Sequence, residues 1–116
     1  MILWGNGNPK REMIYVDDLA DACIYFMKKR FKETIINIGT GKDYMIKEYV
    51  KLIARVILPN KNIKIKYDKT KPNGTPRKLL NINLSKKYGW LAKTTLEVAI
   101  LETYKDFLKK NRVYKG

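Results

Sequence analysis

The spacing of apolar residues changes along this chain, and that change limits the fold more than any other feature. Some segments repeat apolar residues every three or four positions, as one face of a helix does. Others are short β-branched or alternating runs, which predict strands. The alternation predicts an α/β fold with about three main helices and short strands. The helical segments lie at 17–30, 46–57 and 94–108, and the strand-like runs at 11–16, 34–38 and 63–67.

The first helical segment begins at two carboxylates. We expect Asp17 or Asp18 to cap it, because oxygen acceptors satisfy the free amides of a first turn. Lys28-Lys29-Arg30 suits its C-terminal end. Its buried face is predicted to include Cys23, as a small apolar side chain and not a nucleophile. The other members of that face are Leu19, Ala22, Phe26 and Met27.

The later helices carry clearer end signals. Met45 stands where a capping box would place Ser or Thr, three residues before Glu48, so that cap is predicted to be missing. A short helix at 84–88 should stop at Gly89, with Trp90 packed beneath it. Thr94-Thr95-Leu96-Glu97 is a capping box for the last helix. The apolar faces comprise Ile46, Tyr49, Val50, Ile53 and Ile57 in the second helix, ended by Pro59, and Leu96, Ile100, Tyr104, Phe107 and Leu108 in the last.

Composition excludes several kinds of chemistry. The 116 residues suit one domain and contain no histidine and one cysteine, so zinc sites of the Cys/His kinds and His-based nucleophilic dyads cannot form. One cysteine also rules out an intramolecular disulfide, and a reducing, cytoplasmic location is expected. The longest apolar run, 22–27, is too short for a membrane span, and the first four residues do not resemble a signal peptide.

The net charge of +14 first suggests a polyanionic partner such as nucleic acid. However, 20 of the 25 basic residues are Lys, which favours a compositional bias spread over surface positions. One stretch is different, since residues 69–95 hold seven basic residues and no acidic one. An anion is expected there. A stand-alone nucleic-acid-binding protein stays the alternative, although no helix-turn-helix, RNP or zinc signature is visible.

Two short motifs resemble known functional motifs but do not indicate those functions. Gly39-Thr40-Gly41-Lys42 resembles a phosphate loop, but Ile36 stands where a Walker loop needs Gly and Asp43 where it needs Ser or Thr. It also lacks the third glycine of a dinucleotide fingerprint, so a turn at the exit of a strand is predicted. Tyr-x-x-x-Lys pairs occur twice, as Tyr25/Lys29 and Tyr67/Lys71, which is what chance gives with 8 Tyr and 20 Lys.

Two loops carry the candidate binding residues. Trp4 and Arg11 flank the glycine-rich loop 5–9, and Lys78 ends the proline-bracketed loop 71–78. Arg11 offers a planar, two-pronged cation for phosphate, whereas Lys78 would act as a point charge. A packed tryptophan and solvated cations are the alternative interpretation of the same residues.

These loops and the segments between them resemble extended short-chain dehydrogenases/reductases that act on nucleotide sugars. The resemblance covers essentially the whole chain. The second loop, Lys71-Pro72-Asn73-Gly74-Thr75-Pro76-Arg77-Lys78-Leu79-Leu80, narrows it to the GDP-L-fucose synthases. The shared runs are Leu3–Glu12, Tyr15–Ala20 and Ile36–Gly41.

That resemblance implies an enzyme that epimerises GDP-4-keto-6-deoxy-mannose at C3 and C5 and then reduces C4 with NADPH. It implies that Trp4, Arg11, Asn73 and Lys78 contact the GDP-sugar, with the two cations on its pyrophosphate. Asn73 and Asn81 stand where the family typically has Asp. An amide at Asn73 can still accept and donate hydrogen bonds to a sugar hydroxyl.

The family's NADP loop, its Ser/Tyr/Lys set and its Cys/His pair lie N-terminal to the matched region. Residues 1–116 are therefore expected to be a C-terminal substrate-binding domain without a Rossmann domain. Alone, the chain is expected to bind no cofactor or metal and to be inactive. The family is typically homodimeric. Another nucleotide-sugar epimerase or dehydratase is the second alternative, which the proline-bracketed loop disfavours.

Overall fold

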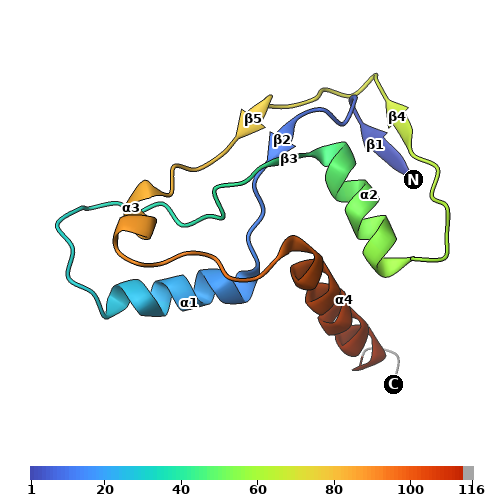
Figure 1. Cartoon of the computed structure of the whole chain (residues 1–116). Coiled ribbons are helices and arrows are strands. Elements are labelled where there is room, and N and C mark those ends of the chain that lie inside the picture. The colour runs from blue at the N-terminus through green and yellow to red at the C-terminus, as the bar shows by residue number, and fades with distance from the viewer. Residues whose placement is uncertain (114–116) are drawn as a thin grey trace.

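The computed structural model describes residues 1–113, and within them the chain forms an α/β fold, as predicted. Two small sheets lie at one end, and the helices extend away from them (Figure 1). The elements in chain order are β1 (Ile2–Trp4), β2 (Lys10–Arg11), α1 (Val16–Met27), β3 (Tyr44–Met45), α2 (Ile46–Ile57), β4 (Lys66–Asp68), β5 (Arg77–Lys78), α3 (Asn83–Lys87) and α4 (Leu96–Val113).

The sheets join segments that are far apart in the sequence. β1 pairs with β4 in parallel, with Ile2 opposite Lys66. β2 is the centre of the second sheet, antiparallel to β3 and parallel to β5, with Arg11 opposite Lys78. The β2–β5 pairing therefore brings the two loops that flank the candidate cations side by side.

The strand predictions are correct only in part. The run 63–67 contributes its last two residues to β4, the run 11–16 only its first residue to β2, and β1 was not predicted. Residues 34–38 form no strand, because none of the described residues pairs with them in a ladder. β-branched residues favour an extended backbone, but a strand also requires a neighbour that accepts and donates its hydrogen bonds.

The start of α1 corrects the predicted cap. Tyr15 is the N-cap and makes no side-chain capping bond. Asp18 is instead buried at 8% exposure and accepts hydrogen bonds from the Thr94 amide (2.9 Å), the Thr94 hydroxyl (3.0 Å) and the Lys93 amide (3.2 Å). The carboxylate therefore ties α1 to the segment before α4.

The predicted buried face of α1 is largely wrong, and Cys23 is exposed, contrary to our prediction. Only Ala22 is fully buried, whereas Leu19 is 40% and Met27 85% exposed. Apolar residues occur around most of this helix, so periodicity alone did not identify the covered side. A second apolar stripe is left open to solvent, comprising Val16, Leu19, Ala20, Cys23, Ile24 and Met27.

α2 confirms its prediction, with Tyr49 buried and the rest of the predicted face half-buried. The Glu48 carboxylate accepts the Met45 amide at 2.6 Å, so half of the capping box exists although Met45 cannot supply the other half as a hydroxyl would. α2 ends at Ile57, before Pro59.

The last two helices also follow the sequence signals. α3 stops before Gly89, whose φ of +87° is the left-handed conformation that favours glycine. Trp90 is 3% exposed, and its Nε1 donates to Asp21 at 2.9 Å, confirming the packed tryptophan.

The start of α4 is shifted by one residue from the predicted box. Thr95 is the cap, with its Oγ1 accepting the Val98 amide at 3.4 Å, because the Thr94 hydroxyl donates to Asp18. α4 packs on α2 and buries Ala99. Phe107 and Leu108 are 59% and 41% exposed, so their predicted burial is wrong.

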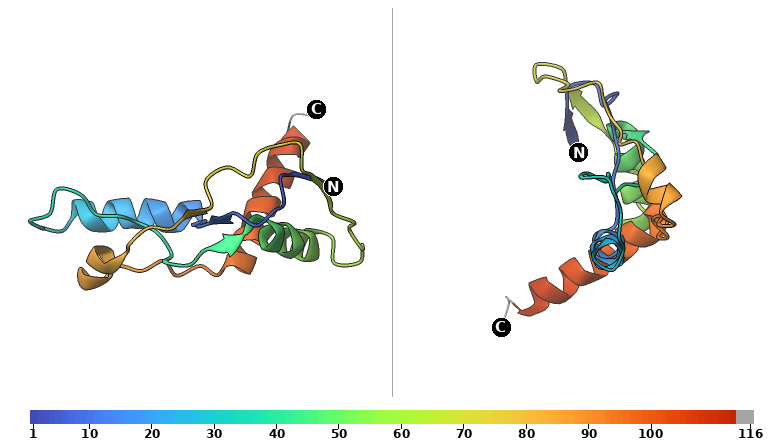
Figure 2. Two further views of the ribbon diagram at one scale, coloured as in Figure 1. Left: turned by 90° about the horizontal axis from the view of Figure 1, so that it is seen from above. Right: turned by 90° about the vertical axis from the view of Figure 1, so that its left-hand side faces the viewer.

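The molecule is an open, curved layer measuring 49 × 40 × 23 Å (Figure 2). Its radius of gyration is 17.2 Å, against about 13 Å for a compact domain of this length. The core is correspondingly small, and a wide apolar groove of about 1170 Å³ lies between α2 and α4. No helix among the described residues is long and apolar enough to span a membrane. Among the residues whose burial the structure describes, the buried apolar side chains are Ala22, Tyr49, Trp90 and Ala99.

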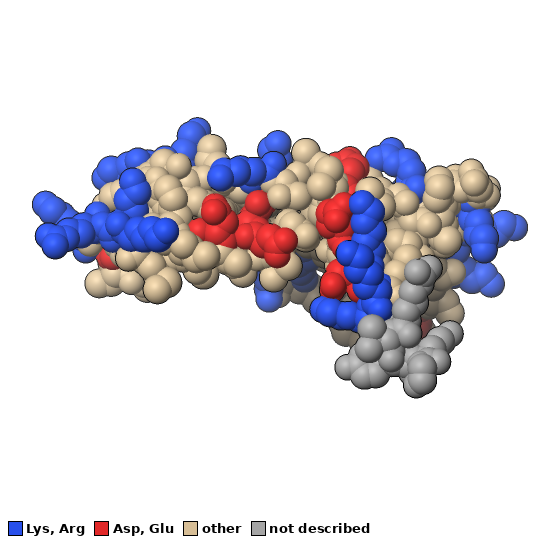
Figure 3. Space-filling view, turned by 90° about the horizontal axis from the view of Figure 1, so that it is seen from below, with Lys and Arg blue, Asp and Glu red and all other residues tan. Residues whose placement is uncertain are grey.

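On the face shown in Figure 3, the charged side chains are not collected in one patch. On the face in Figure 3, acidic side chains gather in the middle, while Lys and Arg lie at both ends and along a ridge beside them. This distribution agrees with the interpretation of most lysines as solvated surface residues.

Candidate anion-binding site

The two predicted loops contact each other. Asn73 Oδ1 accepts the Asn6 amide at 2.8 Å. Gly5 has a φ of +68°, and a Cβ at Gly5 would lie 2.2 Å from the same Oδ1. Only glycine meets both conditions, so the close contact between the loops depends on it. Asn73 therefore already uses its acceptor inside the protein.

The second loop is fixed to β2 by polar contacts. The Lys10 amide donates to Pro76 O at 2.8 Å, and Arg11 Nη1 donates to the carbonyls of Thr75 (2.7 Å) and Lys10 (2.6 Å). Every residue from 71 to 80 is exposed, so hydrogen bonds rather than burial hold this segment.

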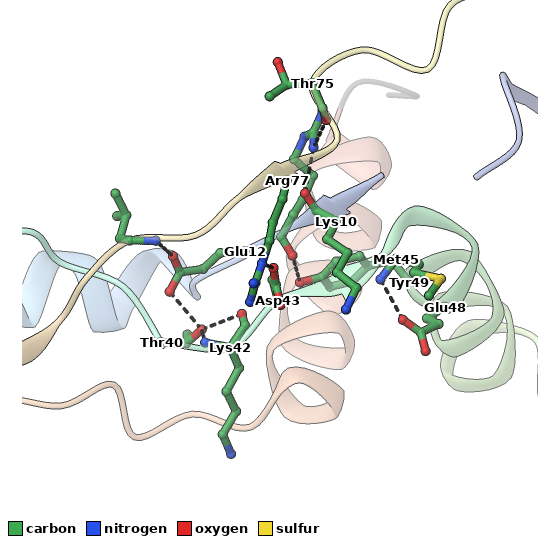
Figure 4. Close-up of polar contacts among 12 residues, drawn as sticks. Lys10, Glu12, Thr40, Lys42, Asp43, Met45, Glu48, Tyr49, Thr75 and Arg77 are labelled. Atoms are coloured by element: carbon green, nitrogen blue, oxygen red, sulfur yellow. Dashed lines mark hydrogen bonds and ion pairs between the residues drawn. The ribbon is translucent and has the colours of Figure 1, made fainter. Parts of the chain in front are cut away.

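Two arginines at this place have different roles. Arg77 directs its Nε (2.5 Å) and Nη2 (3.3 Å) to Asp43, whose side chain is 7% exposed (Figure 4). The hydrogen bond from Arg77 lowers the pKa of Asp43, and the same pairing raises the pKa of Arg77. The corresponding Nε/Nη2 edge of Arg11 makes no hydrogen bond within residues 1–113. Arg11 thus keeps the edge that can bind two oxygens of one phosphate.

Lys78 lies directly opposite Arg11 in the parallel pairing and is exposed, with no ion-pair partner among the described residues. Trp4 is 69% exposed at the end of β1, and Lys71 Nζ lies 5.7 Å from its ring centroid. The structure therefore brings the four sequence-predicted residues onto one pair of loops. Trp4 is not a packed core residue, because most of its surface is open.

Residues 39–41 bind an internal carboxylate. Glu12 Oε1 accepts the Gly41 amide at 2.6 Å and the Thr40 hydroxyl at 3.2 Å (Figure 4). Two donors that a phosphate could use, the Gly41 amide and the Thr40 hydroxyl, are thereby directed at Glu12, and no strand precedes the turn, contrary to the predicted strand exit. This turn does not fit a dinucleotide phosphate, so no cofactor-dependent step is assigned to it.

Sequence reasoning missed the carboxylates that organise the site, Glu12 and Asp43. Both are spaced too far from their partners along the chain for local patterns to indicate the pairing. The signal that could have found them is the small number of acidic residues. With 11 Asp and Glu among 116 residues, a carboxylate in or beside a loop is a candidate partner for a basic side chain or a backbone amide. Within the part of the chain that is described, no group of three or more potential metal ligands occurs.

Comparison with known proteins agrees with the resemblance to nucleotide-sugar enzymes. Residues 1–39 match the NAD dependent epimerase/dehydratase family. The chain is 38% identical over 109 residues to GDP-L-fucose synthase 1 of Arabidopsis thaliana, covering 94% of this chain and 33% of the relative. It is 34% identical to GDP-L-fucose synthase of Escherichia coli, covering 100% and 38%, and 42% identical to GDP-L-colitose synthase of Yersinia pseudotuberculosis, covering 93% and 35%.

Solved structures give the same result. The fold matches a GDP-6-OMe-4-keto-L-xylo-heptose reductase from C. jejuni with a TM-score of 0.81 and 30% identity, covering 94% of this chain and 34% of the other. It matches a UDP-N-acetylglucosamine 4-epimerase from Methanobrevibacter ruminantium with a TM-score of 0.82 and 25% identity, covering 94% and 34%. The chain spans about a third of the length of the curated relatives it matches. The fold corresponds to a C-terminal region of these enzymes.

Proposed function

We propose that this chain, a sequence relative of the GDP-L-fucose synthases over about a third of their length, is the GDP-sugar-binding portion of such an enzyme. The observation that carries the proposal is the free Nε/Nη2 edge of Arg11, held beside Lys78 by the β2–β5 pairing. Two adjacent cations, one planar and one compact, suit the two phosphates of a nucleoside diphosphate.

The surrounding residues supply the rest of the ligand contacts in this proposal. The ring of Trp4 is 69% exposed at the start of the first loop, with Lys71 Nζ 5.7 Å from its centroid, and offers a flat aromatic face. Asn73 keeps its Nδ2 donor free of any hydrogen bond in the described chain, while its Oδ1 holds the first loop. Contact between the Asn73 amide and a sugar hydroxyl would therefore be through donation from Nδ2.

The proposal gives the chain no part in hydride transfer. NADPH would supply the hydride in the complete enzyme, and the chain's own side chains bind and orient the nucleotide sugar. A polypeptide of residues 1–116 alone should therefore not oxidise NADPH when mixed with the keto-sugar. A fall in the absorbance of NADPH, above that of a chain-free control, would contradict this.

The open surface of the layer supports the assignment of residues 1–116 as one domain of a larger enzyme. The apolar stripe on α1 and the groove between α2 and α4 expose side chains that normally pack against another layer. We propose that an NADP-binding domain covers part of this surface, in a cytoplasmic and typically homodimeric enzyme.

Calorimetric titration with GDP tests the central proposal. Arg11→Ala and Lys78→Ala should each weaken binding at least about tenfold, since each removes a charged hydrogen bond to phosphate. Arg55→Ala and Lys86→Ala are matched controls, because both residues are exposed and lie on helices outside the site. Equal affinity in all four variants would exclude the site.

Two alternatives are distinguished by the same assay. UDP in place of GDP tests for another nucleotide-sugar epimerase or dehydratase, because one structural relative acts on a UDP-sugar. Duplex DNA tests the nucleic-acid alternative suggested by the charge of +14. Binding of DNA with steep salt dependence, and poor competition by GDP, would favour that alternative.

A further inference from the structure

We infer that Glu12 is a positioning residue for the proposed anion site, although its charge has the wrong sign for binding an anion. The inference rests on the proposed function. Glu12 directly follows Arg11, and its carboxylate joins three segments of the chain (Figure 4). Oε1 accepts from Thr40 and Gly41, and Oε2 accepts the Leu80 amide at 2.9 Å.

The contact with Leu80 fixes the segment that carries Lys78. β5 contains two residues, and a ladder this short gives little stability by itself. The second loop is held before β5 by Asn73 and Thr75 and within it by Arg77. Beyond Lys78, the first polar contact among the described residues is the bond from the Leu80 amide to Glu12, and a longer one follows at the Asn81 carbonyl, which accepts from Asn37 Nδ2 at 3.3 Å. Glu12 therefore keeps Lys78 aligned with Arg11 on the adjacent strand.

The other half of the contact holds the carboxylate itself in place. The Gly41 amide and Thr40 hydroxyl fix Oε1, so Oε2 points to Leu80. Gly39 packs against this group, since a Cβ there would lie 2.5 Å from Oε1. Gly39 has no left-handed φ, so the close approach of the Glu12 carboxylate, and not the backbone conformation, favours glycine at this position.

A substitution that removes the charge of Glu12 distinguishes a positioning role from an electrostatic one, because the two roles predict opposite changes in GDP affinity. Glu12→Gln keeps the size of the side chain and removes its negative charge. If Glu12 acted only through charge, its loss beside the cations would strengthen GDP binding. If it positions Lys78, binding should weaken, because a Gln amide turns a donor toward an amide that now has no acceptor.

We expect Glu12→Gln to weaken GDP binding about five- to tenfold in calorimetry and to speed hydrogen exchange of the Leu80 amide. Glu48→Gln is the matched control, since Glu48 also accepts a backbone amide, at Met45, and should leave GDP affinity unchanged. Unchanged or tighter binding by a folded Glu12→Gln variant, or unchanged Leu80 exchange, would overturn the inference.

Gly39→Ala provides a second route if Glu12→Gln fails to fold. It displaces the carboxylate while keeping its charge, so it should also weaken GDP binding and expose the Leu80 amide. If wild type itself binds no GDP, the proposed function fails. If wild type binds and Gly39→Ala binds equally well, only the positioning role of Glu12 fails.

Discussion

The two ends of the molecule are stabilised in different ways. The loop end, residues 1–12 and 66–80, is held by hydrogen bonds to backbone groups and by one ion pair, with most side chains exposed. The helix end, α1, α3 and residues 88–95, buries Ala22, Ser85 and Trp90 and closes over the Asp18 carboxylate. Burial supplies stability, whereas the polar contacts of the loop end fix geometry at little energetic gain. Ligand contacts are expected on the less stable end.

Replacing the buried carboxylate should give the largest loss of stability. Asp18→Ala leaves the Thr94 amide and hydroxyl and the Lys93 amide without their acceptor, so the free energy of unfolding should fall by about 3 kcal/mol. Urea denaturation followed by circular dichroism measures it. Asp106→Ala removes an exposed carboxylate paired with Lys110 and should cost under about 0.5 kcal/mol. Equal losses would show that the helix end is not specially stabilised.

Forcing the two loops apart tests the loop end. Gly5→Ala introduces a Cβ against Asn73 at a left-handed position, and should cost roughly 2 kcal/mol and weaken GDP binding. Gly74→Ala has the same backbone strain, with φ of +72°, but its Cβ would lie 3.5 Å from the nearest atom. It should cost about 1 kcal/mol. If both variants behave alike in urea denaturation, contact between the loops adds nothing beyond strain.

Acid should selectively weaken the β2–β3–β5 sheet. Because the hydrogen bond from Arg77 lowers the pKa of Asp43 in the folded chain, this pair stabilises the fold above the usual aspartate pKa of about 3.9. That stability is lost as pH falls through the lowered value. The urea midpoint of wild type should therefore drop more between neutral pH and pH of about 2 than that of Asp43→Asn. If the urea midpoints of wild type and Asp43→Asn fall equally with pH, the Arg77–Asp43 pair contributes nothing to stability.

The smallest effect is expected at Asn73. Asn73→Asp keeps an oxygen that accepts the Asn6 amide, so stability should change by less than about 0.5 kcal/mol, whereas Asn73→Ala should cost about 1 kcal/mol. The melting temperatures of the two variants, each compared with that of wild type, measure these losses. A large loss in the Asp variant would show that the amide nitrogen at this position is needed as well.

The sequence predicted what depends on local signals. α2, the stop of α3 at Gly89 and the burial of Trp90 follow from spacing and turn residues within a few positions. The exposed face of α1 could not be predicted in this way, because a helix with apolar residues on two sides does not reveal which side another element covers. In the site, the loops were identified, but Asp43, which neutralises Arg77, lies 34 positions away along the chain.

The parallel pairing of β1 with β4 has a consequence for how the chain folds. Ile2 lies opposite Lys66, so the pairing closes a loop of more than half the chain before Trp4 is held in place. α1 and α2 can form from contacts within a few residues, while the loop end forms only after this long closure and its entropic cost. During synthesis, the residues at the start of the chain would be among the last to reach their final positions.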